Sequence, residues 1–230
     1  FEILLDNNPI FDDEKINNVS LFLKRQELSK ILFFNEIYSK IINLHGVIME
    51  FGVRWGQNLT TLNNLRGIYE PYNYSRKIVG FDTFNGFPSV RDQDGKFEYN
   101  QLGSFNVSDN YEEYLNKVLK CHENECPLNH ISKNFLIKGN AIETLEQYLK
   151  DHPETIISFA YFDFDIYEPT LSCLKLILPY LSKGSIIGFD ELCDPGFPGE
   201  TLALREILGT NKFKLERNRF SALQSYLTFK

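Results

Sequence analysis

The chain has 230 residues, a length that suits one domain with a substantial core together with a helical extension. Hydrophobic residues make up 43% and charged residues 24%, which argues against a disordered chain and is typical of a globular protein. A formal net charge of -7, from 24 basic and 31 acidic residues, argues against a nucleic-acid-binding protein, because such proteins usually carry a basic surface.

The first predicted element is a helix over residues 14 to 43, where apolar residues recur at steps near three and four between Lys and Glu. Five short apolar runs follow, each typical of a buried parallel strand: "GVIMEFG", "KIVGFDTF", "NFLIKGN", "IISFAYFDFD" and "GSIIGFDEL". Helices are predicted within "VRWGQNLTTLNNL" and over residues 109 to 120, 141 to 150 and 169 to 181. Alternating strands and helices predict an α/β fold with a doubly wound, Rossmann-like sheet.

The chain is expected to divide near residue 45. Residues 1–45 form the predicted N-terminal helical extension or lid, and residues 46–230 form the predicted Rossmann-like catalytic domain. Within that domain the polar segment from Arg91 to Asn110 is predicted to be a mobile loop or a lid, because long loops in compact domains are often functional.

Cysteine use and hydropathy predict the compartment. No run of about 18 apolar residues is present, so no transmembrane helix and no membrane partner are expected. The four cysteines form no dense framework, and no signal pattern precedes them, which predicts free thiols and a cytoplasmic location. In "CHENECPLNH", Cys121 to His130, the spacing fits neither CxxC pairs nor a zinc finger, so a polar loop is favoured over a metal site.

Polar residues lie at or just after the ends of all five predicted strands: Glu50, Asp82, Asn140, Asp163 and Asp190. In a doubly wound sheet, ligands bind at the carboxyl ends of the strands. The pattern therefore predicts one ligand site at that edge.

The first strand leads into "EFGVRWGQN", which contains Glu50, Gly52 and Gly56. The GxxxG spacing departs from the GxGxxG of dinucleotide sites and so disfavours a nicotinamide cofactor. ExGxxxG is instead used by Rossmann-like methyltransferases to hold the aminocarboxypropyl part of S-adenosylmethionine. A simple tight turn remains the alternative, since glycine is common in turns.

The next two strand ends offer further cofactor contacts. Asp82 in "FDTFNGFP" can accept hydrogen bonds from ribose hydroxyls, or it can merely cap a helix. Gly139 and Asn140 precede another predicted helix, and Asn140 either contacts adenine or caps that helix.

Two acidic pairs, Asp163 with Asp165 and Asp190 with Glu191, end the last two apolar runs. Carboxylates suit a hard divalent cation such as Mg²⁺, which could lower the pKa of a substrate hydroxyl. Residues two apart on a strand share a face, so Asp163 and Asp165 could both point into this site, but the favoured expectation is that Asp165 turns away and caps the helix after Pro169. The alternative is a solvated or salt-bridged edge.

The sequence resembles the TylF-type, or macrocin, O-methyltransferases, which methylate sugars on natural products. The resemblance covers roughly residues 40 to 205 and rests on five stretches in the family's order: "GVIMEFGVRWGQNL", "IVGFDTFNGFP", "FLIKGNAIETL", "YFDFDIYEPTLSCL" and "LSKGSIIGFDEL". It implies a class I, S-adenosylmethionine-dependent enzyme with a magnesium site.

The resemblance also implies roles for individual residues. Asp163, Asp190 and Glu191 would bind the metal, and Asp163 and Asp190 would be catalytic. The implied cofactor-binding residues are Glu50, Phe51, Gly52, Arg54, Asn58, Asp82, Thr83, Gly139, Asn140 and Asp163. Two positions depart from the family pattern: Phe164 replaces a small residue, and Glu191 replaces an aspartate.

The expected acceptor is a small molecule, a sugar or a glycosylated or nucleotide-linked intermediate, and a homo-oligomer is expected. A metal-dependent glycosyltransferase that uses Asp163-Phe164-Asp165 as a DxD motif is the first alternative, but it leaves the ExGxxxG turn without a role. A non-catalytic cofactor-binding module is the second. The tail "DELCDPGFPGETLALREIL" is expected to shape the acceptor pocket.

Overall fold

The sheet contains the five predicted strands and two more. The computed structural model describes residues 5–220 and 222–230, and within them seven strands form one sheet in the order β3-β2-β1-β4-β5-β7-β6. Strands β1 to β5 pair in parallel, whereas β7 is antiparallel to both β5 and β6. The strands are β1 (Val47–Phe51), β2 (Ile78–Asp82), β3 (Asn134–Lys138), β4 (Ile157–Phe162), β5 (Leu181–Phe189), β6 (Glu216–Arg217) and β7 (Ser225–Thr228).

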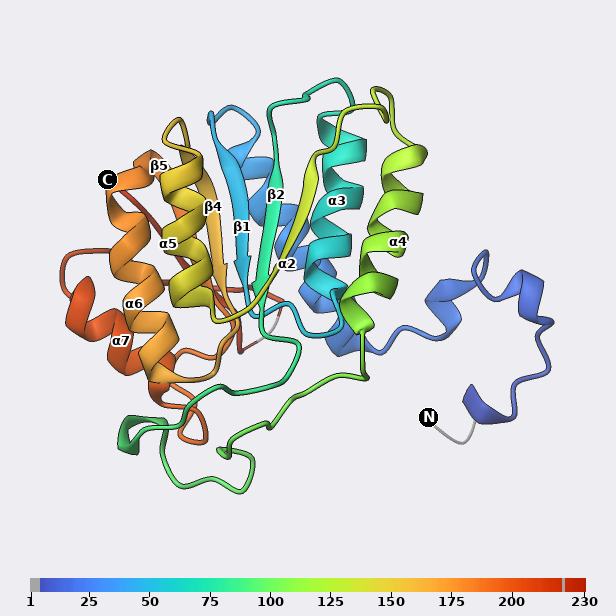
Figure 1. Cartoon of the computed structure of the whole chain (residues 1–230). Coiled ribbons are helices and arrows are strands. Elements are labelled where there is room, and N and C mark those ends of the chain that lie inside the picture. Colours follow the sequence, from blue (N-terminus) through green and yellow to red (C-terminus); the bar gives the residue numbers. More distant parts are fainter. Residues whose placement is uncertain (1–4, 221) are drawn as a thin grey trace.

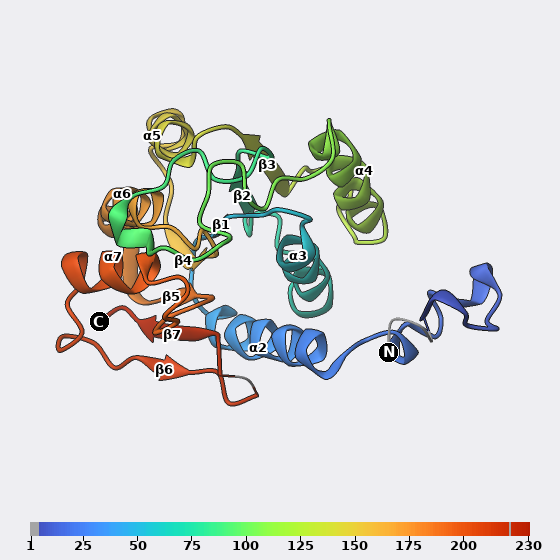
Figure 2. The same ribbon diagram turned by 90° about the horizontal axis from the view of Figure 1, so that it is seen from below.

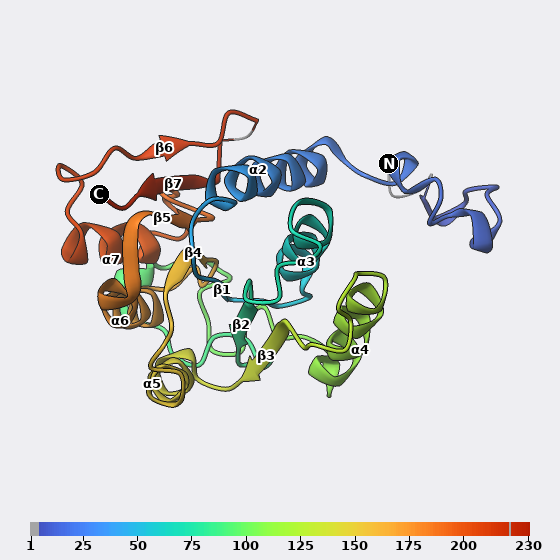
Figure 3. The ribbon, with the colours of Figure 1, turned by 90° about the horizontal axis from the view of Figure 1, so that it is seen from above.

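Helices cover both faces of this sheet (Figures 1 and 3). Helices α5, α6 and α7 lie on one face, and α2, α3 and α4 lie on the other, which confirms the predicted doubly wound α/β fold. The helices are α2 (Arg25–Ile41), α3 (Gln57–Tyr69), α4 (Tyr111–Asn124), α5 (Ala141–Asp151), α6 (Tyr167–Ile177) and α7 (Gly199–Ile207). Single 3-10 turns occur at Asp12–Glu14, Val19–Leu21, Asp92–Asp94 and Leu178–Tyr180.

The central strands are buried on both faces, as parallel strands between two helical layers must be. Along β1, Met49 and Phe51 join the core on the α5–α7 side, while Ile48 joins the core on the α2–α4 side. The Phe51 ring stacks between the rings of Phe81 and Phe162, with centroid distances of 5.2 and 4.8 Å. This packing fixes the ends of β1, β2 and β4 relative to one another.

The predicted N-terminal helix is shorter than its periodicity suggested. It begins at Arg25, and the chain before it runs away from the body of the molecule (Figures 1 and 2), with Ile16 84% exposed. Only from Phe33 onwards does the apolar face meet the sheet, and packing rather than local propensity stabilises most protein helices. The division at residue 45 stays a prediction, and residues 1–4 of the extension lie outside the described residues.

The segment after β2 is tied to α6. The Arg91 Nε donates to Glu168 at 2.9 Å, and the backbone N–H of Tyr167 donates to Asp94 at 2.5 Å. These contacts place residues 87 to 105 over the carboxyl edge of the sheet.

Two further expectations concern the cysteines and membranes. All four cysteines are free thiols, as predicted, and no three metal-ligating side chains converge within the described residues, those of the Cys121–His130 segment included. No described helix combines the length and the hydropathy that crossing a membrane requires.

Candidate active site

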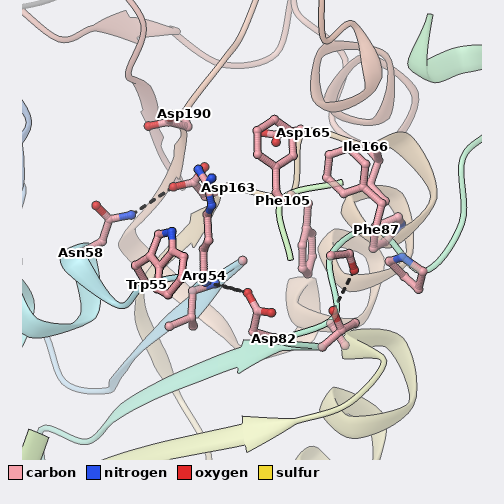
Figure 4. Close-up of a pocket in the computed structure, with 18 of the residues that line it drawn as sticks. Arg54, Trp55, Asn58, Asp82, Phe87, Phe105, Asp163, Asp165, Ile166 and Asp190 are labelled. Atoms are coloured by element: carbon pink, nitrogen blue, oxygen red, sulfur yellow. Dashed lines mark hydrogen bonds between the residues drawn. The ribbon is translucent and has the colours of Figure 1, made fainter. Parts of the chain in front are cut away.

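A pocket of about 280 Å³ opens at the carboxyl ends of the parallel strands (Figure 4). Most of the predicted site residues line it, although they come from the ends of five separate strands. Those that line it are Gly52, Arg54, Asn58, Asp82, Thr83, Gly139, Asn140, Asp163, Asp190 and Glu191. Phe51 lies instead in the aromatic core, and Glu50 lies fully buried beneath the pocket.

The glycines of the first loop are required by close contacts. Gly52 has φ +91°, and a Cβ there would lie 2.0 Å from the backbone oxygen of Asp163, so only glycine lets the exits of β1 and β4 approach so closely. Gly56, at φ +80°, precedes α3, whose first turn leaves backbone N–H groups free for a ligand.

Asp82 holds this loop in place. Its Oδ2 accepts hydrogen bonds from the backbone N–H groups of Val53 and Arg54, at 2.7 and 2.8 Å, and its Oδ1 accepts one from Phe84 at 2.6 Å. Figure 4 shows the Asp82–Arg54 contact beside the pocket. Three acceptor positions of the carboxylate are therefore occupied by the protein's own backbone. The predicted contact with the ribose hydroxyls would have to use the remaining lone pair.

Asn140 caps helix α5, which was one of the two roles predicted for it from the sequence. Its side chain accepts the backbone N–H of Ile142 at 3.1 Å, at the start of α5. Because Asn140 also lines the pocket, the cap does not remove it from reach of a ligand. The adenine contact stays a prediction.

A lysine that sequence reasoning missed lies between two of the predicted metal ligands. Lys30 of α2 places its Nζ 3.4 Å from Asp163 Oδ2 and 3.1 Å from Asp190 Oδ1. Asn58 also donates to Asp163, at 3.0 Å, and Gln224 to Asp190, at 2.9 Å (Figure 4 for Asn58). The ammonium thus joins the ends of β4 and β5.

This arrangement shifts the pKa values of both partners. Burial and the charge of Asp190 raise the pKa of Asp163, Lys30 opposes both effects, and the pKa is about 6. Burial acts to lower the pKa of Lys30, but the two carboxylates outweigh it and the pKa rises above its ordinary value. At neutral pH, Lys30 is therefore charged and Asp163 is mostly ionised.

Asp165 does not cap α6, contrary to expectation. Its backbone has φ +63°, its side chain lines the pocket, and the residue at the N-cap of α6 is Ile166, which makes no side-chain cap. Burial, followed by the neighbouring charge of Glu191, raises the pKa of Asp165 well above its ordinary value. The left-handed backbone turns this carboxyl group inward instead of along the helix axis.

Glu200, at the start of α7, supports this turn. Its Oε1 accepts the backbone N–H groups of Phe164 and Asp165, at 3.0 and 3.4 Å. Glu200 has no exposed surface, and burial with the nearby charge of Asp163 raises its pKa well above the ordinary value. The tail predicted to shape the acceptor pocket thus reaches the site through Glu200.

The predicted magnesium ligands do not form a ready metal site as they are placed. Asp163 and Asp190 share the Lys30 ammonium, and burial raises the pKa of Glu191 to about 7, so that carboxyl is only partly ionised at neutral pH. Among the described residues no three ligating side chains converge on one point. The oxygen donors suit Mg²⁺ chemically, but a cation would have to replace the lysine.

Residues that sequence reasoning missed share one property: they reach the site from helices or from the C-terminal strands. Lys30 is one of two lysines on the amphipathic helix α2, and Glu200 follows a glycine-containing stretch with no motif. The expectation that ligands bind at the carboxyl ends of parallel strands finds neither of them, because it concerns only residues that follow those strands.

Comparison with solved structures identifies the relatives of the chain. A crystal structure of CalS11, a calicheamicin methyltransferase, is 44% identical with a TM-score of 0.96, covering 99% of this chain and 89% of that one. The apo structure of CalS11, a TDP-rhamnose 3'-O-methyltransferase, is 41% identical with a TM-score of 0.86, covering 99% and 90%.

More distant likeness supports the fold alone. The O-methyltransferase NovP is 16% identical with a TM-score of 0.64, covering 87% of this chain and 79% of that one. No family model matches the sequence, and no curated protein does so either. The identity to CalS11 over nearly the whole chain is decisive: the chain belongs to the family of S-adenosylmethionine-dependent O-methyltransferases that contains CalS11, of the TylF-like kind that its motifs indicate.

Proposed function

We propose that the protein transfers the methyl group of S-adenosylmethionine to a hydroxyl group of a sugar, and that the sugar is carried on a nucleotide. The observation that carries the proposal is the 44% identity to CalS11 over 99% of the chain, since the apo CalS11 structure is that of a TDP-rhamnose 3'-O-methyltransferase. The pocket at the strand ends supplies the polar groups that such a reaction needs.

The two halves of the pocket suit different substrates. Asp82 holds the loop Gly52–Gly56 in place, and the first turn of α3 after this loop leaves backbone N–H groups free for the amino acid part of the cofactor. The carboxyl groups of Asp163, Asp165 and Asp190 lie on the other side, where an acceptor hydroxyl would bind.

The transfer itself needs a proton acceptor. The hydroxyl oxygen forms a bond to the methyl carbon as the bond from that carbon to sulfur breaks, and the hydroxyl proton passes to the carboxylate of Asp163. A methyl ether and S-adenosylhomocysteine are the products. A pKa of about 6 suits Asp163 to this role, because a base is most effective when its pKa lies near the working pH.

Magnesium assistance belongs to the proposal as a separate part. Its predicted ligands are Asp163, Asp190 and Glu191, which offer hard oxygen donors. Because Lys30 now neutralises two of them, no step above is assigned to the cation. A glycosyltransferase is not favoured, because the membership of the chain in a methyltransferase family gives the first loop its role.

Calorimetric titration with S-adenosylmethionine and a methyl-transfer assay test the proposal together. The acceptors are TDP-rhamnose, free rhamnose and TDP-glucose, each with methyl-labelled S-adenosylmethionine. We expect saturable cofactor binding and transfer to a nucleotide sugar in preference to the free sugar. Cofactor binding with transfer only to free sugars would remove the nucleotide from the proposal. Absence of cofactor binding would contradict the proposal as a whole.

A further inference from the structure

We propose that Lys30 is an internal counter-ion that competes with a divalent cation for Asp163 and Asp190, so that the cation binds only when the lysine of α2 leaves. The proposal rests on the proposed function and concerns the regulation of the same site. It treats Lys30 as a residue that controls access to the carboxylates and takes no direct part in methyl transfer.

The geometry places the ammonium where a shared cation would lie. Its Nζ contacts one oxygen of each carboxylate, at 3.4 Å from Asp163 and 3.1 Å from Asp190. The side chains of Lys30 and Asp163 are each 21% exposed, and that of Asp190 is 10% exposed. Charges so poorly solvated interact strongly, so two adjacent carboxylates need a positive partner.

A divalent cation and the ammonium cannot occupy the carboxylates together. Mg²⁺ and Mn²⁺ bind carboxylate oxygens directly, and these are the oxygens that accept from Lys30. A doubly charged ion at contact distance would also repel the ammonium. The lysine side chain has a flexible four-carbon stem and lines the pocket. Its ammonium group can therefore move away from the carboxylates without movement of the backbone.

The site carries more acidic groups than one ammonium can neutralise. Within the described residues, neither oxygen of the fully buried Glu50 has a hydrogen-bond partner, and Glu191 Oε2 and Glu200 Oε2 also lack one. Glu50 lies close enough to Lys30 and Asp163 to feel both charges. Unpartnered buried carboxyl oxygens around a single lysine point to a cation of higher charge as the alternative occupant.

Competition at Lys30 would couple the cation to helix α2. Lys30 and Glu27, which accepts from Gln57 at 2.9 Å, are contacts between the first half of α2 and the rest of the site. Linkage is reciprocal, so a cation that displaces Lys30 must also weaken the hold of the site on this part of α2.

Mn²⁺ binding to the purified full chain without cofactor tests the proposal, read by electron paramagnetic resonance and calorimetry. Lys30→Met removes the charge and keeps the length of the side chain, and Lys30→Arg keeps the charge. Lys40→Met is the matched control, because Lys40 lies on the same helix and pairs with Glu36 at 3.5 Å. We expect Lys30→Met to bind Mn²⁺ at least tenfold more tightly than wild type, with Lys30→Arg and Lys40→Met within about threefold of it.

The outcomes separate this proposal from the proposed function. Equal or weaker Mn²⁺ affinity in a folded Lys30→Met variant would overturn the competition, as would absence of Mn²⁺ binding in wild type and Lys30→Met alike. Hydrogen exchange supplies a second readout: Mn²⁺ should speed exchange in the first half of α2 in wild type, and unchanged exchange would also count against it. Failure to bind S-adenosylmethionine would contradict the proposed function and leave the Mn²⁺ comparison intact.

Discussion

Asp82 provides the sharpest test of how the first loop binds the cofactor. Its carboxylate accepts three backbone N–H groups, from Val53, Arg54 and Phe84, at 2.6 to 2.8 Å. Asp82→Ala would leave all three without this partner. The donors of Val53 and Phe84 are partly buried, and at about 1–2 kcal/mol each their loss should lower the free energy of unfolding by about 2–4 kcal/mol.

The same substitution should loosen the loop that faces the cofactor. We expect S-adenosylmethionine to bind Asp82→Ala about 10- to 100-fold more weakly, or about 1.4–2.8 kcal/mol. Asp82→Asn is the informative comparison, because its amide oxygen can still accept from Val53 and Arg54, while its NH₂ group would face the N–H of Phe84. If Asp82 acts mainly through the loop, Asp82→Asn should lie midway between wild type and Asp82→Ala in both cofactor affinity and stability.

Calorimetric titration and urea unfolding of the three proteins measure both quantities. Asp109→Asn, an exposed aspartate on the segment before α4, is the control and should match wild type. The reasoning would be refuted if Asp82→Asn kept wild-type stability but lost as much cofactor affinity as Asp82→Ala. That result would assign the carboxylate to the ribose hydroxyls instead of to the loop.

Three further predictions use other contacts. Gly52→Ala would place a Cβ 2.0 Å from the Asp163 oxygen and should lower the free energy of unfolding, measured in urea, by about 2–4 kcal/mol. Gly103→Ala, with φ +77° and its nearest neighbour 4.0 Å from the added Cβ, should lose about 1 kcal/mol. Equal losses would show that backbone strain alone matters. Asp163→Asn should reduce kcat by about 10²–10⁴-fold while cofactor affinity by calorimetry changes little, and a parallel loss of affinity would contradict separate roles. The folded-state pKa values of Asp163 (about 6) and Glu191 (about 7) exceed their ordinary 3.8 and 4.5, so the folded state holds protons that the unfolded state releases. The free energy of unfolding without ligands should therefore fall as pH rises from about 4 to 7, by up to about 1.4 kcal/mol per pH unit for each group, and level off above about pH 7. Asp163→Asn should flatten the slope, and the exposed Glu154→Gln should not.

The central sheet could be predicted because each of its parallel strands has a recognisable sequence pattern. Each of the five parallel strands is a short run of apolar residues, since both of its faces are buried. β6 and β7 were missed because both are short: β6 has two residues, and β7 has four, of which only Tyr226 and Leu227 are buried. The first helix was predicted to begin too early. Ile16 and Leu21 continue the apolar periodicity, but both side chains are exposed and do not pack against the core.

The candidate site could be predicted only in part. The carboxyl ends of parallel strands meet at one edge, so Asp82, Asp163 and Asp190 were expected together and line one pocket. Lys30 could not be found in this way, because it lies 133 positions before Asp163 and reaches the site through the packing of α2. The direction of Asp165 depends on one φ angle, which the sequence does not reveal for a residue other than glycine.

The segment over the pocket has a consequence for the redesign of acceptor choice. It contributes Phe87, Pro88 and Phe105 to the wall, yet its anchors, the Arg91–Glu168 and Asp94–Tyr167 contacts, lie beside the wall and bind the start of α6. The wall and its fastening are therefore separable. A segment transplanted from a relative with another substrate should seat correctly when it keeps these two anchors, so the chain offers an exchangeable cassette on a fixed cofactor-binding base.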